Sequence, residues 1–152
     1  NIHNFHHTQY IMKPAGFFKR IFSLMYDTLA VLGIIFSFTL VLVLINGEIS
    51  SENPINSFLQ RAILILSGPL FYCYFWLKSE GQTLGMQAWK IRLVSEDGSD
   101  LSWSICIKRC VISFLTILPL GVGFAYMFFD KENRSLSDIY TRTRVVDIKN
   151  QI

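Results

Sequence analysis

The chain has 152 residues, enough for one ordinary domain. Hydrophobic residues make up 51% of it and charged residues only 16%, whereas a soluble domain carries about 25% charged residues. The composition therefore predicts an integral membrane protein. It excludes a disordered chain, a collagen and a small disulfide scaffold. The net charge of +3 is too small and too scattered to indicate a nucleic-acid partner.

The first predicted element is a membrane-spanning helix from Ile21 to Ile45, a stretch of 25 residues in which Asp27 is the only charged residue. A bilayer core of roughly 30 Å needs about 20 helical residues, so this stretch crosses comfortably. Residues 1–14 before it are predicted to form a flexible tail without a cleavable signal peptide. The three histidines of this tail are assigned no metal; they are His3, His6 and His7.

The second predicted span is Ala62 to Leu77, with 16 residues between Arg61 and Lys78. A helix of this length reaches only about 24 Å, but the two flanking cations can snorkel and lengthen it. Four aromatic residues at its end are typical of an interfacial belt; they are Tyr72, Tyr74, Phe75 and Trp76. We therefore expect a second full crossing.

The third apolar stretch runs from Cys110 to Phe129 and has 20 residues, but Pro119, Gly121 and Gly123 interrupt it. These residues disfavour a continuous helix. The stretch therefore either crosses as a third span or breaks and returns as a re-entrant hairpin. A break is tolerated only where protein or a water cavity covers the freed backbone groups.

The distribution of lysine and arginine favours the hairpin. Residues 1–20 contain three of them, residues 78–109 five and residues 130–152 five, whereas residues 46–61 contain one. Basic segments stay in the cytoplasm, so the N-terminus and residues 78–109 are predicted to be cytoplasmic and residues 46–61 external. Only the hairpin brings the basic tail to the cytoplasmic side as well.

A small sheet is predicted outside the bilayer. Polar and apolar residues alternate from Lys90 to Val94, and Asp97-Gly98 is a strong signal for a type I′ turn, with a return strand over 99–101. Arg144–Ile148 is a further candidate strand, which could pair with residues 90–94 if the tail is cytoplasmic. The predicted fold is an all-α integral membrane protein: two full transmembrane helices, a third Pro/Gly-broken segment and a small cytoplasmic β-hairpin.

Two residues are predicted to start the helices of the cytoplasmic side. Ser102 is a plausible N-cap for the helix that carries Lys108 and Arg109 to the membrane face. Ser135 and Asp138 have the spacing of a capping box, so a further helix is expected to begin at residue 136.

Asp27 is the sharpest candidate for function. It follows Arg20 by seven residues, so both share one helix face, with Asp27 about 10 Å deeper and leaning back towards Arg20 and Ser23. A carboxylate at the bilayer centre costs roughly 2.5–3.5 kcal/mol on insertion scales, so a partner or a role is expected. Asp27 either pairs with a cation from another helix or takes part in ion or proton handling.

No motif supports an enzyme. Walker, HExxH, GxSxG and GxGxxG patterns are absent, and no cofactor is expected. Cys106 and Cys110 stand four apart and Cys73 lies in the second span. An odd number of thiols with one in the lipid argues against a disulfide set, so they are interpreted as inert apolar side chains, with no metal site.

Three motifs in order resemble the RDD family, bacterial membrane proteins named for one Arg and two Asp. Phe17–Asp27 resembles the family's opening, and Gly81–Met86 followed by Ile91–Val94 resembles its central motif. The closing residues also fit; they are Arg109, Asp130, Arg134–Asp138 and Thr143–Val146. Ser23, Lys19 and Lys90 depart from the residues usual in the family. The resemblance covers residues 15–148 and leaves 149–152 as a C-terminal tail.

The resemblance implies that Arg20, Asp27 and Asp138 are the defining residues, with Arg109 a further member of their network. It also implies a multi-pass protein of the bacterial inner membrane that transports unspecified ligands; cation/proton antiport is attributed to some members. In a transporter, Asp27 would exchange a proton for a monovalent cation, Arg20 would bias it and Asp138 would lie at the cytoplasmic mouth.

Two spans and a hairpin cannot enclose a pathway alone, so the transporter would be a homo-oligomer or would act with a partner membrane protein. The alternative is a non-catalytic membrane module that binds or stabilises a partner membrane protein, where the same residues form a structural network. Water access discriminates the two functions, because an antiporter needs Asp27 to be reachable and a structural network would seal it.

Overall fold

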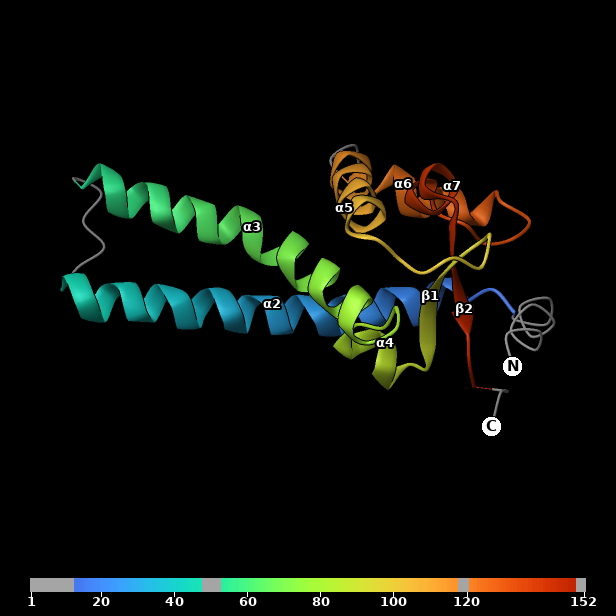
Figure 1. Cartoon of the computed structure of the whole chain (residues 1–152), viewed down its shortest axis with the longest axis horizontal. Coiled ribbons are helices and arrows are strands. Elements are labelled where there is room, and N and C mark those ends of the chain that lie inside the picture. The colour runs from blue at the N-terminus through green and yellow to red at the C-terminus, as the bar shows by residue number, and fades with distance from the viewer. Residues whose placement is uncertain (1–12, 48–52, 118–120, 150–152) are drawn as a thin grey trace.

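Two long helices run side by side and project from a smaller head formed by the other elements (Figure 1). The computed structural model describes residues 13–47, 53–117 and 121–149, so most of the predicted N-terminal tail lies outside the described residues. The helices and strands are α2 (Phe17–Asn46), α3 (Pro54–Lys78), α4 (Leu84–Ala88), β1 (Ile91–Ser95), α5 (Trp103–Ile117), α6 (Val122–Ala125), the 3₁₀ helix η3 (Tyr126–Phe128), α7 (Leu136–Thr141) and β2 (Thr143–Asp147).

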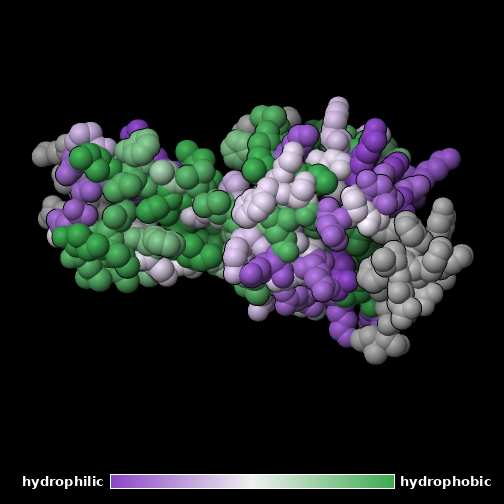
Figure 2. Space-filling view, in the orientation of Figure 1, coloured by the Kyte–Doolittle hydropathy of each residue, from purple (hydrophilic) through white to green (hydrophobic). Residues whose placement is uncertain are grey.

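The two predicted spans lie within α2 and α3, and both helices are long and apolar enough to cross a membrane. α2 ends at Asn46 and is capped by Gly47, whose φ of 79° suits glycine and whose N–H donates to the Val43 carbonyl. α3 begins at Pro54 after Asn53, whose side chain accepts from the Ile55 N–H. In Figure 2 hydrophobic residues cover the outer part of this helix pair, and hydrophilic residues gather on the head.

The third apolar stretch is divided between shorter elements. α5 ends at Ile117 after 15 residues, α6 begins at Val122, and the two helices contact each other. A Cβ at Gly123 would lie 2.3 Å from Thr116 Oγ1, so only glycine permits this approach. Pro119, which is predicted to break the stretch, lies outside the described residues. Within the described ranges, α2 and α3 alone have the length and hydropathy of a membrane span.

β1 and β2 form an antiparallel two-stranded sheet in which Ile91 lies opposite Asp147 and Ser95 opposite Thr143. The predicted pairing between the tail and residues 90–94 is therefore confirmed. The predicted return strand over 99–101 is wrong, because those residues form no strand. Gly98 has a positive φ but Asp97 does not, so the type I′ geometry that a tight hairpin needs is not formed, and β2 takes the pairing edge instead.

Side chains complete the turn after β1. The carboxylate of Asp97 accepts hydrogen bonds from the hydroxyls of Ser95 and Ser99 and from the Ser99 N–H, so the turn is bonded to itself. On the other edge of β2, the Ala15 N–H donates to the Val145 carbonyl and Asp147 N–H donates to the Lys13 carbonyl. Residues 13–15 therefore lie along β2, and they hold the start of α2 against the sheet.

The hydrophobic core lies where α3, α4, α5 and the sheet meet. It consists of Ala15, Cys73, Trp76, Met86, Ile91, Leu93, Cys106 and Val145. The buried residues of α2 all lie in its first eleven residues, and those of α3 in its last eight. Only these ends of the long helices are therefore packed into the head, and the outer apolar side chains are half-buried between the two helices or exposed on the described chain.

Candidate functional site

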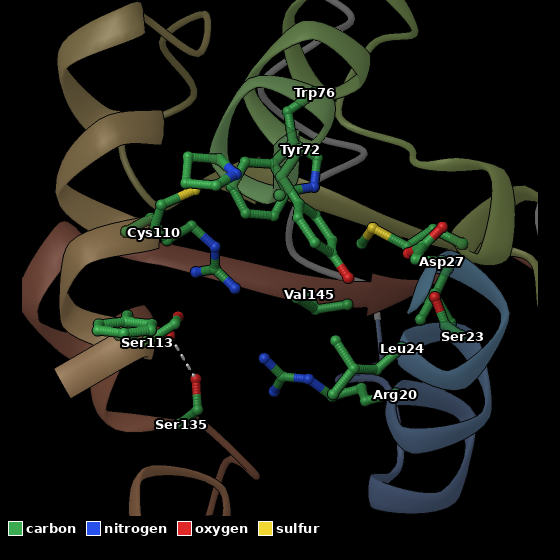
Figure 3. A pocket seen from close by; sticks show the side chains of 17 residues that line it. Arg20, Ser23, Leu24, Asp27, Tyr72, Trp76, Cys110, Ser113, Ser135 and Val145 are labelled. Carbon is green, nitrogen blue, oxygen red and sulfur yellow. Dashed lines mark hydrogen bonds between the residues drawn. The ribbon is translucent and has the colours of Figure 1, made fainter. Parts of the chain in front are cut away.

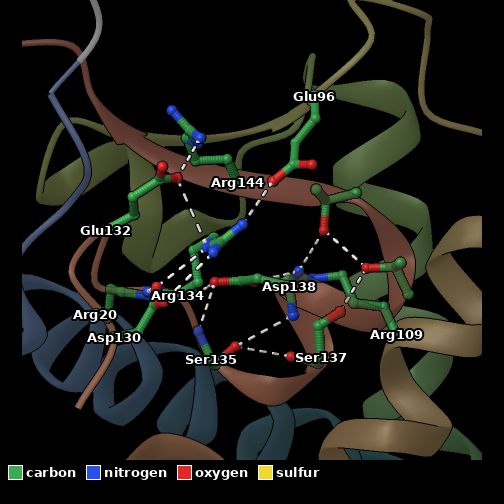
Figure 4. A network of polar contacts seen from close by, with 12 residues as sticks. Arg20, Glu96, Arg109, Asp130, Glu132, Arg134, Ser135, Ser137, Asp138 and Arg144 are labelled. Atoms are coloured by element: carbon green, nitrogen blue, oxygen red, sulfur yellow. Dashed lines mark hydrogen bonds and ion pairs between the residues drawn. The ribbon is translucent and has the colours of Figure 1, made fainter. Parts of the chain in front are cut away.

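Asp138 joins three helices within the head. Its Oδ2 accepts from Arg20 Nη2 at 2.5 Å and its Oδ1 from Arg109 Nη1 at 2.5 Å (Figure 4). Ser135 contributes its N–H at 3.0 Å and caps α7 through the predicted capping box, which is confirmed. The side chains of Arg20, Arg109 and Asp138 are 5%, 7% and 0% exposed. This arginine clamp therefore ties α2 and α5 to α7.

The two arginines determine the protonation state of this carboxylate. Burial by itself would raise the pKa of Asp138, but the charges of Arg109 and Arg20, with the hydrogen bonds from Arg20 and Ser135, hold that pKa below its ordinary value. Asp138 is therefore an anion at neutral pH. Because one carboxylate faces two guanidinium groups, the clamp has one excess positive charge.

Both arginines have further partners. Arg20 Nη1 donates to the Asn133 carbonyl at 3.0 Å, and Arg109 Nη1 also donates to Thr143 Oγ1 at 2.7 Å. The Arg109 guanidinium lies 5.3 Å from the centre of the Trp76 ring, a cation–π contact. The clamp is thus connected to β2 and to the end of α3.

A second, more exposed ion network lies beside the clamp (Figure 4). Its residues are Glu96, Asp130, Glu132, Arg134 and Arg144. The hydrogen bond from the Arg134 side chain lowers the pKa of Asp130. Because these side chains are between an eighth and a half exposed, solvent screens the network and it contributes less than the buried clamp.

Asp27 lies in a different environment. Its Oδ2 accepts from the Thr83 hydroxyl at 2.5 Å and its Oδ1 from the Gly85 N–H at 2.8 Å. Thr83 is the N-cap of α4 and also accepts from the Met86 N–H at 3.2 Å. Asp27 therefore supplies an acceptor to the first turn of α4, where backbone N–H groups have no partner within the helix.

Asp27 was predicted to point towards Arg20, and the two residues share a cavity but do not bind each other. Both residues line one cavity, yet within the described ranges Asp27 makes no ion pair, and Arg20 binds Asp138 instead. The partners of Asp27 are neutral donors from another element. The structure therefore brings Arg20, Arg109 and Asp138 into contact and leaves Asp27 apart from them.

Two glycines make the approach of α4 possible. A Cβ at Gly85 would lie 2.2 Å from the Ser23 carbonyl oxygen and 3.1 Å from Asp27 Cγ, so α4 rests on the backbone of α2. Gly81 has a φ of 84°, and a Cβ there would lie 2.1 Å from the Leu93 carbonyl oxygen. The motif from Gly81 to Gly85 is therefore a joint between α2, α3 and β1.

A cavity of about 240 Å³ lies between α2, α3 and α5 (Figure 3). Figure 3 shows Asp27 and Ser23 on one side, Ser113 and Cys110 on the other, and the Tyr72 hydroxyl extending towards the middle. Arg20 and Arg109 line it as well, whereas Asp138 does not. Asp27 therefore borders this cavity, but with 1% exposure it is almost as inaccessible to solvent as Asp138, which is 0% exposed.

Several residues of this site occur in the sequence motifs or the predicted interfacial belt, but their role in it was not predicted. Thr83, Gly85, Trp76 and Thr143 each contact one of the predicted residues. Thr83 carries a sequence signal, because threonine before an apolar turn is a good N-cap. Trp76 was predicted to be part of an interfacial belt, and it is instead buried against Arg109.

The cysteines lie together at the α3–α5 contact. Cys73 Sγ is 4.0 Å from Cys110 Sγ, and all three thiols are free. Across residues 13–47, 53–117 and 121–149, no group of three or more His, Cys, Asp or Glu side chains could hold a metal ion. The thiols therefore pack as apolar groups.

Comparison with known proteins identifies one family. The model of the RDD family matches residues 14–142, which is most of the chain. No curated protein and no solved structure matches it. The family match includes Arg20, Asp27, Arg109 and Asp138.

Proposed function

The chain belongs to the RDD family, and from that premise we propose that it is a multi-pass protein of the bacterial inner membrane that moves a cation or small solute coupled to protons. Family membership and the two apolar helices fit a membrane protein. No enzymatic activity and no cofactor are assigned to it. The proposal is built on the contrast between the two buried carboxylates.

The proposed topology has both ends of the chain in the cytoplasm, with α5 and α6 forming a re-entrant hairpin. The pairing of β1 with β2 supports it, because residues 91–95 and 143–147 must lie on the same side of the bilayer. The count of basic residues supports a cytoplasmic location for that side.

One observation carries the transport proposal: Asp27 lines a cavity between three helices. A carboxylate within a membrane span is expensive and usually faces a pathway or a partner. Asp27 has neutral hydrogen-bond partners, so no arginine holds it in the ionised form as in the clamp. It is therefore the group proposed to gain and lose the coupled proton, while Asp138 with Arg20 and Arg109 holds the helices around it.

One chain is too small to form a transport pathway alone, so the proposed transport requires an assembly of several chains. Two spans and a hairpin cannot enclose a pathway, and the outer halves of α2 and α3 have no fully buried side chain within the described chain. We propose that these faces contact lipid and further copies of the chain, or a partner membrane protein. The cavity of each copy would then supply one binding site.

The test is reconstitution of the purified protein into liposomes with a trapped pH-sensitive dye. Pulses of Na⁺, Li⁺ or K⁺ should drive proton movement in the wild type and not in Asp27→Asn. Ser37→Ala is the matched control, because Ser37 is exposed on the same helix and its hydroxyl bonds only the Gly33 carbonyl. Loss of activity in the control, or persistent activity in Asp27→Asn, would contradict the role of Asp27.

A silent wild type together with a less stable Asp27→Asn would favour the second candidate, a non-catalytic module that binds or stabilises a partner membrane protein. Two observations favour it: the hydrogen bonds from Thr83 and Gly85 give Asp27 a structural role in holding α4, and Asp27 is only 1% exposed, as expected of a residue sealed within a structural network. Photocrosslinkers placed at Phe36 and Leu44, both exposed on the outer half of α2, would then be used in membranes to identify the neighbour.

A further inference from the structure

Arg109 has one edge without an acceptor. Its Nη1 serves both Asp138 and Thr143, whereas its buried Nε has no hydrogen-bond partner and no bond from Nη2 is found among the described residues. Arg92 and Arg144 also have an unpaired Nε, but their side chains are about a third exposed, whereas that of Arg109 is 7% exposed. An arginine fork binds planar oxyanions through two parallel N–H bonds.

The charge around this edge is also incomplete. Arg20 and Arg109 share a single carboxylate, Asp138, so one buried positive charge has no close counterion in the clamp. Asp27 lines the same cavity but bonds Thr83 and Gly85 rather than either arginine. A buried charge is costly unless it is paired, so an anion that enters the cavity would be stabilised here.

Further donors lie in the same cavity wall. The indole N–H of Trp76 is buried without an acceptor, and Trp76 lies under the Arg109 guanidinium. Tyr72 extends its hydroxyl into the cavity (Figure 3). Indole and guanidinium groups only donate hydrogen bonds, so a ligand that pairs with these groups has to supply acceptor atoms.

The mouth of the cavity is apolar. Trp76, Arg109 and Val145 line the cavity from buried positions, whereas Pro69 and Phe114 line it from exposed positions on α3 and α5. Phe114 is 67% exposed. The volume of about 240 Å³ is below the roughly 300–1,000 Å³ of drug-sized ligand sites, so the cavity has room for a headgroup and only the start of a chain.

We propose that this cavity binds an anionic amphiphile: one carboxylate or phosphate head at the Nε–Nη2 edge of Arg109, with an apolar tail that leaves past Pro69 and Phe114. The inference deepens the small-solute form of the proposed function, on which it rests in taking the cavity as the binding site, and it names an anion rather than a cation as the ligand. The shared chemistry is a planar or tetrahedral oxyanion on a hydrocarbon chain, whether a free fatty acid or an acidic membrane lipid supplies it.

Thermal unfolding of the full chain in a nonionic detergent tests the binding. Dodecanoate and dodecyl phosphate should raise the melting temperature saturably, whereas dodecanol and inorganic phosphate should not. Phosphatidylglycerol against phosphatidylcholine forms a second arm: a shift with the anionic lipid only points to the membrane as the source, and a shift with dodecanoate only points to a free fatty acid. Equal shifts with dodecanol, a shift with inorganic phosphate alone, or no shift with any anionic probe would overturn the proposal.

Paired variants separate the site from effects of charge on the micelle. Gly68 lines the cavity and a Cβ there would meet nothing within 4 Å, so Gly68→Leu should fill the space without unfolding the chain. Gly33 has the same free surroundings on α2 and does not line the cavity, so Gly33→Leu is the control. We expect at least tenfold weaker binding in Gly68→Leu and unchanged binding in Gly33→Leu; equal binding in both would overturn the site.

Arg109→Lys tests the fork itself, because lysine keeps the charge near Asp138 but loses the paired N–H edge. Tenfold weaker binding of dodecanoate is expected, and full affinity would contradict the assigned edge. If this variant does not fold, Gly68→Leu still decides the proposal. Binding in micelles needs no transport, so a silent liposome assay with intact binding would reject the proposed transport alone, and active transport without anion binding would reject this inference alone.

Discussion

Asp27 and Asp138 are both buried, yet their surroundings differ in kind. Asp138 accepts from two guanidinium groups and one backbone N–H, while Asp27 accepts from a hydroxyl and a backbone N–H. Charge partners hold a carboxylate ionised, and removal of either side leaves an unpaired buried charge. Neutral partners leave the protonation state adjustable. The two carboxylates are equally buried, but their different partners make Asp138 part of a fixed ion-pair clamp and Asp27 a candidate proton site.

Removal of the Asp138 carboxylate should have the largest effect. Asp138→Ala leaves Arg20 and Arg109 buried and unpaired, so it should cost about 3–5 kcal/mol of unfolding free energy. Thermal unfolding and size-exclusion profiles in detergent measure this. Asp100→Ala, at an exposed position, is the control. Wild-type stability in Asp138→Ala would show that the clamp does not hold the helices.

Acid should weaken the clamp. Because the pKa of Asp138 is held below its ordinary value, its contribution to stability is fully present above the unfolded-state pKa of about 3.9 and is lost as pH falls through the lower folded-state pKa. Melting temperatures measured from pH 6 to pH 3 should fall. The slope should be shallower in Asp138→Asn, and an unchanged slope there would assign the acid sensitivity to other carboxyls, such as Asp130 and Asp147.

Gly85→Ala should destabilise the contact between α4 and α2 beside Asp27, because the added methyl group overpacks it. The new Cβ would lie 2.2 Å from the backbone oxygen of Ser23, and such crowding typically costs about 1–3 kcal/mol. Gly33→Ala adds the same methyl group where nothing lies within 4 Å, so it should be neutral or stabilising. Similar melting temperatures for the two variants would mean that α4 does not rest on α2.

Asp27→Asn should cost less than Asp138→Ala. The asparagine oxygen can still accept from the Gly85 N–H, but its amide would face the Thr83 hydroxyl, which loses its acceptor. The net loss of one hydrogen bond is about 1 kcal/mol. Thermal unfolding of both variants in the same detergent compares them directly, and a larger loss in Asp27→Asn would reverse the assignment of the two roles.

The smallest effect is expected at the surface. Lys19 pairs with Asp147, and their side chains are 30% and 27% exposed. Lys19→Ala should cost no more than about 1 kcal/mol, and the cost should vanish at high salt because solvent and ions screen such pairs. A salt-independent loss of several kcal/mol would indicate that this pair belongs to the buried clamp.

Local patterns along the chain predicted much of the fold. The apolar runs predicted α2 and α3 because a helix in lipid needs only length and hydrophobicity, and Ser135 with Asp138 predicted the start of α7 because a capping box is complete within four residues. The hairpin after β1 was predicted wrongly. Asp97-Gly98 favours a local return, but a strand almost fifty residues later provides the backbone partner for β1.

The candidate site was predicted only in part, because its contacts join distant segments. Arg20, Asp27, Arg109 and Asp138 were chosen from their residue types and motifs, whereas nothing in the spacing indicates that Asp138 binds both arginines. The partners of Asp27 lie 56 and 58 positions away. Their identity depends on the close approach of α4 that Gly85 permits.

Residue chemistry alone settles that the chain has two long apolar helices, a polar side and a carboxylate among apolar neighbours, since hydrophobicity, charge and capping act over a few residues. Only the folded arrangement decides which carboxylate binds the arginines, which one lines a cavity, and which buried arginine N–H lacks an acceptor. Those outcomes depend on packing between helices far apart in the sequence. Gly85 is an example, because the absence of its Cβ lets α4 approach the backbone of α2.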